Sequence, residues 1–123
     1  MDAMRPFIED REAVLARLGG SETMLARLLD KFCRSYSRAP EELETLLESG
    51  QHEEARRLVH SVKGVSANLG LASIYRSSIA LENKLKDESE RPLPEIHSFK
   101  TEIQRIIDGF SRTIDDAPSR QDQ

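Results

Sequence analysis

Apolar residues recur at spacings of three and four positions through most of this sequence, which is the period of amphipathic helices. No stretch alternates apolar and polar residues as a strand does, and no internal repeat is visible, so we predict an all-α fold. The stripes predict one short helix and four longer ones, over residues 10–18, 21–49, 51–69, 71–86 and 94–113. Four long helices that are each polar on one side bury their stripes best as an antiparallel bundle, with the short helix capping one end.

Residues that start or stop helices set the predicted boundaries. Ser21 suits the N-cap of the long second helix, because its hydroxyl can accept a backbone N–H of the first turn. Pro40 interrupts the hydrogen bonding of that helix, although the apolar stripe continues beyond it in register, so we expect a kink or break there. Gly50 and Gly70 suit the left-handed position that ends a helix.

The length of 123 residues corresponds to one domain with a single modest core. We expect a flexible N-terminus over residues 1–6 and a helical domain over residues 7–114. Residues 115–123 are polar and without periodicity, so we expect a disordered tail.

Composition narrows the class of protein. The net charge is −4 and no run of Lys and Arg occurs, whereas a nucleic-acid binder would present a basic face. Cys33 is the single cysteine, so no disulfide can form within the chain. We expect its side chain to act as a small apolar group or to be a free thiol. No apolar run approaches the roughly 18 residues of a membrane span, and the N-terminus lacks the apolar core of a signal peptide. We therefore expect a cytoplasmic protein without membrane contact.

The helix predicted over residues 51–69 contains two features that its amphipathic pattern does not explain, an outward-facing histidine and a glycine one turn after it. Its apolar or small residues lie within about 60° of Val62 on a helical wheel, whereas His60 lies about 160° away. One turn on is Gly64, which costs about 1 kcal/mol relative to alanine inside a helix. Ala67 follows on the same face, so the imidazole would stand on a surface cleared of side chains. A lone surface histidine is usually only a polar residue, but this setting indicates an accessible nucleophile.

Several short segments stand in a fixed order along the chain. The site helix and its successor contain His60-x-x-Lys63-Gly64, Asn68-Leu69-Gly70 and Leu81-Glu82. Before them stand Leu15-Ala16-Arg17-Leu18-Gly19-Gly20-Ser21-Glu22, Leu25, Leu28-Leu29 and Ala39-Pro40. Together these segments resemble the histidine-containing phosphotransfer (HPt) domain of bacterial two-component phosphorelays, over roughly residues 7 to 113. The resemblance implies an antiparallel up-down four-helix bundle with a short N-terminal capping helix.

The resemblance also implies a function. His60 would accept a phosphoryl group from the aspartyl-phosphate of a receiver domain, or from a kinase, and pass it to a response-regulator aspartate. Histidine suits this chemistry because its ordinary pKa near 6.5 leaves a free lone pair at cytosolic pH. The chain would be a phosphoryl carrier without autonomous catalysis, with no cofactor of its own, the Mg²⁺ lying on the receiver. Its partners would be response-regulator receiver domains and a hybrid sensor histidine kinase. The chain would be a monomeric free-standing carrier, although a domain cut from a larger kinase would look similar.

Three residues would support His60. Gly64 gives clearance for a partner, and Lys63 can reach back toward a phosphoryl group on the imidazole. In related domains a Glu or Gln twenty-two residues after the histidine holds its second ring nitrogen, and Glu82 has that place. The helical wheel requires the site helix to be rotated toward its neighbour for this contact, and Glu82 could instead be a surface acid.

Four further residues are possible phosphoryl or partner contacts, and each could equally be an ordinary surface residue. Arg56 and Arg57 precede His60 by one turn and could add positive field, whereas Ala67 and Asn68 follow it toward the end of the helix. Asn68 could also help to end the helix. A partner would meet an apolar patch fringed by basic residues on the outward side of the site helix and its neighbour.

Three other classes of protein compete with this interpretation. A di-iron bundle requires Glu-x-x-His pairs, and the residues three before the histidines are Ser49, Arg57 and Pro94, so no metal site is expected. A hydrolase or transferase acting on a small molecule would need a Gly-rich phosphate loop or a Ser/His/Asp set, and neither is recognisable. The main alternative is a helical adaptor that binds receiver or kinase domains without being phosphorylated.

Overall fold

The structure is a computed structural model of the chain that describes residues 6–89 and 91–115, without the side chains of residues 113–115. The expected flexible N-terminus and disordered tail lie outside these residues, apart from Pro6 and Asp115. Six helices follow one another: α1 Arg11–Arg17, α2 Glu22–Tyr36, α3 Ala39–Glu48, α4 His52–Asn68, α5 Ala72–Lys84 and α6 Leu93–Asp115. The prediction of an all-α fold is confirmed, since the described residues contain only one isolated β-bridge and no strand.

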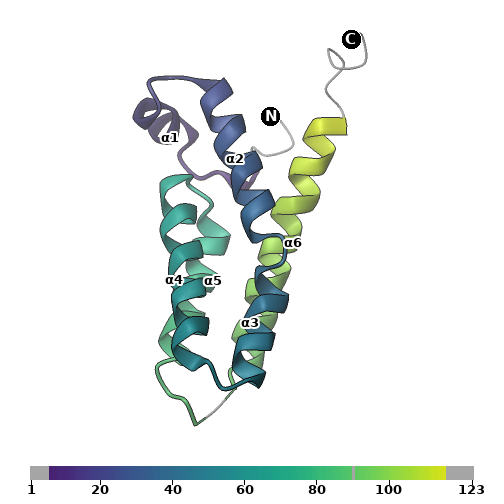
Figure 1. Cartoon of the computed structure of the whole chain (residues 1–123). Coiled ribbons are helices and arrows are strands. Elements are labelled where there is room, and N and C mark those ends of the chain that lie inside the picture. Colours follow the sequence, from purple (N-terminus) through teal and green to yellow (C-terminus); the bar gives the residue numbers. More distant parts are fainter. Residues whose placement is uncertain (1–5, 90, 116–123) are drawn as a thin grey trace.

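The helices form an elongated bundle in which α4 and α5 lie side by side and α6 runs along α5, α2 and α3 (Figure 1). The predicted interruption near Pro40 is a break between α2 and α3. Pro40 lies in the first turn of α3, where the missing N–H of proline has no partner to lose. No helix within the described ranges has the length and apolar character needed to cross a membrane.

A single hydrophobic core joins all six helices. The stripe predicted on the site helix faces this core, where Ala55, Val59 and Val62 are fully buried. Large side chains from the other helices and their caps complete it, and those with the least exposure are Phe32, Phe99, Leu25, Leu29, Leu43, Leu71, Ile74, Leu81, Leu85, Ile103 and Val14. Burial of each such side chain contributes about 1.5–3 kcal/mol, so packing of these stripes fixes which face of α4 remains in solvent.

The turn between α4 and α5 packs closely against the segment around Glu9 that precedes α1. Gly70 has a φ of +69°, and its carbonyl accepts the N–H of Glu9 at 2.7 Å. A Cβ at this position would lie 2.7 Å from the Glu9 carbonyl oxygen and 2.8 Å from Cγ2 of Val14. Only glycine therefore fits between the N-terminal segment and this turn.

We expect Gly70→Ala to destabilise the fold by about 3 kcal/mol, because left-handed strain adds to overpacking against backbone and Val14. Gly50→Ala is the matched control, since Gly50 has a φ of +75° but nothing within 4 Å of an added Cβ. This control should lose only about 1 kcal/mol from strain. Urea unfolding of both variants measures the difference, and equal losses would show that the Gly70 contacts are unimportant.

Candidate functional site

His60 lies on the solvent side of α4, and its side chain is 66% exposed. Gly64 stands one turn further along, and a Cβ built there would meet nothing within 4 Å. Ala67 is also exposed. Toward Gly64 and Ala67, the imidazole therefore stands on a surface without bulky side chains.

Glu82 of α5 holds one nitrogen of this imidazole. Its Oε2 lies 2.9 Å from Nδ1 of His60, and its side chain is only 17% exposed. The helical wheel alone left this contact undecided, because it does not give the distance between the helices. Two small buried residues, Ser66 on α4 and Ser78 on α5, belong to this pair of closely packed helices. The carboxylate can therefore reach across to the solvent side of α4.

Lys63 also binds Glu82, which differs from the expectation that it would reach toward His60. Its Nζ donates to Oε1 of the carboxylate at 2.6 Å, so each oxygen of Glu82 has one partner. Partial burial on its own would raise the pKa of Glu82. The hydrogen bonds and positive charges of Lys63 and His60 outweigh that effect and lower the pKa below its ordinary value of 4.5.

The ionised carboxylate fixes the tautomer of His60. A carboxylate without a proton can only accept hydrogen bonds, so Nδ1 of the imidazole must carry the proton that it donates to Glu82. In the neutral ring the lone pair is then on Nε2, the nitrogen that Glu82 does not hold. A neutral imidazole held in this way presents Nε2 on an open face, which is the form of histidine that can act as a nucleophile.

The two arginines before His60 are held within α4. The guanidinium of Arg56 lies 3.3 Å from Glu53, and that of Arg57 lies 2.8 Å from Glu54. These (i, i+3) pairs can be read from the sequence, and surface pairs of this kind contribute at most about 1 kcal/mol. Neither arginine is directed at the imidazole in this arrangement, although Nε of Arg56 is buried without a hydrogen-bond partner.

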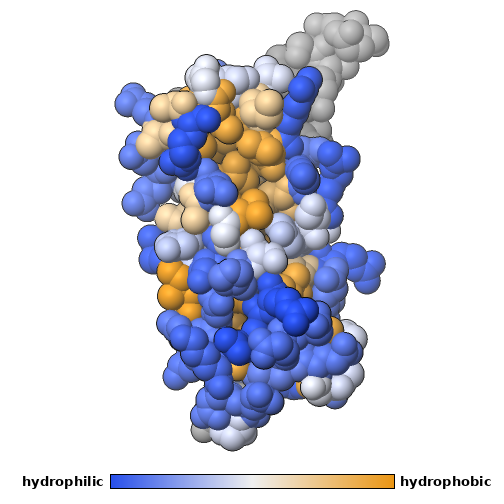
Figure 2. Space-filling view, turned by 60° about the vertical axis from the view of Figure 1, so that its left-hand side comes forward, coloured by the Kyte–Doolittle hydropathy of each residue, from blue (hydrophilic) through white to orange (hydrophobic). Residues whose placement is uncertain are grey.

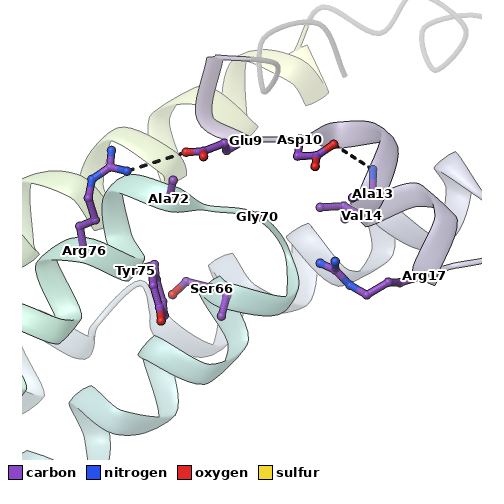
Figure 3. A pocket seen from close by; sticks show the side chains of 11 residues that line it. Glu9, Asp10, Ala13, Val14, Arg17, Ser66, Gly70, Ala72, Tyr75 and Arg76 are labelled. Atoms are coloured by element: carbon purple, nitrogen blue, oxygen red, sulfur yellow. Dashed lines mark hydrogen bonds and ion pairs between the residues drawn. The ribbon is translucent and has the colours of Figure 1, made fainter.

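Ala67 and Asn68 lie where α4 meets α1. Asn68 is the last residue of α4, and its carbonyl accepts a hydrogen bond from Arg17 at 2.5 Å. Ala67 lines a cavity of about 400 Å³, and Figure 3 shows Arg76 of α5 reaching Glu9 across one edge of it. This cavity could not be predicted from the sequence, because helical periodicity does not specify where the short α1 packs against α4 and α5.

The other two histidines and the single cysteine take no part in the hydrogen bonds around His60. Nε2 of His52 bonds the carbonyl of Leu85 at the end of α5, and His97 is exposed on α6. The pKa of the buried Cys33 thiol is raised to about 11, first by burial and then by the charge of Asp30. In the part of the chain that the structure describes, no three His, Cys, Asp or Glu side chains could jointly hold a metal ion.

Glu82→Gln should lower the unfolding free energy at neutral pH by about 1 kcal/mol, because the ion pair with Lys63 and the charged acceptor of His60 are lost. A lowered carboxylate pKa contributes stability that is present above its ordinary value of 4.5 and is lost as the pH falls through the lowered value. The gap between wild type and variant should therefore close below pH 4.5. Unfolding at several pH values measures this gap, with the exposed Glu44→Gln as control, and a constant gap would contradict it.

Comparison with known proteins gives one match. The Hpt domain family matches residues 27–109, which is more than half of the chain and includes both His60 and Glu82. No curated protein and no solved structure matches the chain.

Proposed function

Because the chain belongs to the Hpt domain family, we propose that His60 is its phosphoacceptor in a phosphorelay. Hpt domains are phosphocarrier modules of two-component signalling and interact with receiver domains and kinases. For this chain, we propose that His60 receives the phosphoryl group from a receiver-domain aspartate or a hybrid kinase and gives it to a response-regulator aspartate. The observation that carries this proposal is the hydrogen bond between Nδ1 of the exposed His60 and Glu82, 2.9 Å long.

The transfer step uses the free lone pair of Nε2. This nitrogen attacks the phosphorus of an aspartyl-phosphate in line with the leaving oxygen; the N–P bond forms and the P–O bond to the aspartate breaks. The aspartate leaves as a carboxylate, and the ring, still protonated at Nδ1, becomes positively charged. Glu82 stabilises this charge across the 2.9 Å hydrogen bond. Transfer to the next aspartate reverses these steps, so the chain returns to its starting state.

Lys63 and Gly64 support the step in different ways. Lys63 Nζ donates to the carboxylate that holds His60. A phosphoryl group on His60 would place further anionic oxygens near this ammonium group, which could then bind them as well. Gly64 leaves room for the partner active site, which must approach Nε2 closely. Arg56 and Arg57 are both paired with carboxylates, so they would contribute only their positive charge and no direct contact with the phosphoryl group. Mg²⁺ would be supplied by the receiver domain, not by this chain.

The finer properties expected from the sequence are part of the same proposal. They are an up-down four-helix bundle with α1 as capping helix, a monomeric state, a cytoplasmic location and no catalysis beyond the carrier role. The packing supports the first of these, since α4 packs on α3 and α5, and α6 packs on α5, α2 and α3 (Figure 1).

A panel of phosphorylated receiver domains and autophosphorylated hybrid kinases tests the proposal. The chain should acquire label from at least one donor, and a second receiver domain added afterwards should remove it. The adaptor alternative predicts that the folded chain binds receiver or kinase domains yet acquires no label from any of them.

A further inference from the structure

Two fully buried serines lie on the helices that carry the site, Ser66 on α4 and Ser78 on α5. The hydroxyl of Ser66 donates to the carbonyl of Lys63 on its own helix at 2.9 Å. The hydroxyl of Ser78 has no hydrogen-bond partner among the described residues. Such a hydroxyl is unfavourable in a core, because it gives up its hydrogen bonds to water and gains none. What Ser78 contributes is therefore its small size and not a hydrogen bond.

Both serines lie on the sides of their helices that face each other. With 100° per residue, Ser78 lies about 40° from Glu82 on α5, toward the core. On α4, Ser66 lies about 40° from the core residue Val62, in the direction of Lys63. Lys63 and Glu82 bond each other across the two helices at 2.6 Å. The side of each helix that carries its serine is therefore the side toward the other helix.

The two serines also lie at the same level of the bundle. The helices run in opposite directions from the turn at Gly70 (Figure 1). Ser66 is three residues nearer to this turn than Lys63, which is about 4.5 Å along the axis of α4. Ser78 is four residues nearer to it than Glu82, which is about 6 Å along α5. Because Lys63 and Glu82 are bonded, the two serines lie opposite each other, about one turn from the site.

Side chains at this level limit how closely α5 can approach α4. The axes of packed helices lie about 8–10 Å apart, depending on the side chains at the contact, so small residues permit a close approach. The Glu82 carboxylate reaches across the two helices to Nδ1 of His60 at 2.9 Å. An N–H···O hydrogen bond spans only about 2.7–3.2 Å, so a further separation of about 1 Å would break it. A larger side chain at position 78 would force such a separation.

Neither serine contributes to the surface that a partner would meet. Figure 2 shows the side of the molecule on which α1 and α4 lie, with hydrophobic side chains gathered in the upper half and mostly hydrophilic ones in the lower half. A substitution at position 78 leaves these side chains unchanged, because Ser78 has no exposed surface. Its effect on the site would therefore pass through the position of Glu82.

We propose that Ser78 is a positioning residue for the phosphoryl acceptor, because its small side chain sets the spacing of α4 and α5 at which Glu82 holds Nδ1 of His60. This inference rests on the proposed function and adds a buried residue that acts on His60 through Glu82. The hydrogen bond determines the tautomer that leaves Nε2 free. A larger side chain at position 78 therefore slows transfer without removing the nucleophile.

The first test measures the tautomer of His60 from the ¹⁵N NMR signals of its ring nitrogens in the unphosphorylated chain. The neutral ring of the wild type should carry its proton on Nδ1, because Glu82 accepts it. Ser78→Val should lose this preference, whereas Ser78→Ala should keep it, since alanine is no larger than serine. Ser77→Val is the matched control, because Ser77 is buried on the same helix but pairs with Ser98 of α6 at 3.1 Å. This control should keep the wild-type tautomer.

The second test measures single-turnover transfer from a receiver domain that phosphorylates the wild-type chain. Ser78→Val and Glu82→Ala should each slow transfer about tenfold, because both remove the hydrogen bond to Nδ1. The double variant should be no slower than Glu82→Ala alone, since Ser78 acts through Glu82. Ser78→Ala and Ser77→Val should transfer at the wild-type rate.

Each result has a distinct meaning. A wild-type tautomer and transfer rate in folded Ser78→Val would overturn the inference and leave the role of His60 intact. A double variant much slower than Glu82→Ala would also overturn it, because the two changes would then act independently. If circular dichroism shows that Ser78→Val does not fold, Ser78→Thr makes a smaller enlargement at the same position and enters the same comparisons. If no receiver phosphorylates the wild-type chain, the proposed function is wrong, and the tautomer measurement still decides whether Ser78 positions the ring.

Discussion

Replacing His60 with Gln should abolish phosphoryl acceptance, because glutamine has a similar length but no nitrogen lone pair that can attack phosphorus. The fold should survive, since the His60 side chain is 66% exposed and Glu82 keeps its bond to Lys63. The loss of unfolding free energy should stay below about 1 kcal/mol. Label transfer and circular dichroism on the same preparation measure both effects.

The control for this experiment is His97→Gln, because His97 is also exposed but lies on α6. This variant should accept phosphate as the wild type does. Label on His60→Gln at wild-type levels would show that another residue is the acceptor.

Replacing Gly64 with Gln has the second largest expected effect. Its side chain would project one turn from His60 into the space that a partner active site must enter, so transfer should slow by about 10-fold to 100-fold. The fold should tolerate the change, because nothing lies within 4 Å of an added Cβ at this position. Gly64→Glu should slow transfer further, since its charge repels a phosphoryl group and an acidic receiver. Single-turnover transfer from one receiver measures the rates.

Gly64→Ala separates steric obstruction from helix stability. Alanine is more favourable than glycine inside a helix by about 1 kcal/mol, so this variant should unfold at higher denaturant concentration than the wild type. Its methyl group is small, and transfer should remain close to the wild-type rate. A variant series in which Gly64→Gln transfers as fast as Gly64→Ala would show that clearance at this position is unimportant.

Helical periodicity was sufficient to predict much of the fold. A stripe of 3.6-residue period specifies which side of a helix is buried, so the exposure of His60 and the burial of Val62 could be predicted without knowing the neighbouring helices. The break near Pro40 and the end of α4 just before the left-handed Gly70 follow from local backbone chemistry, which the sequence also specifies.

Contacts between helices could not be predicted in the same way, because a stripe does not give the distance, rotation or offset of two packed helices. The wheel therefore left the contact of Glu82 with His60 undecided. It gave no sign that Lys63 would bind the same carboxylate, 2.6 Å from Oε1.

The chemical stability of the transferred label tests the central claim most directly. The chain is phosphorylated by a receiver domain or hybrid kinase, and samples of the labelled product are treated with acid and with alkali. A phosphoryl group on a ring nitrogen is lost in acid and survives alkali, so we expect an acid-labile, alkali-stable label that is absent from His60→Gln. A label that is lost in alkali would indicate an acyl phosphate, and a label that resists acid would indicate a phosphorylated hydroxyl. Either result would contradict the assignment of His60 as the phosphoacceptor.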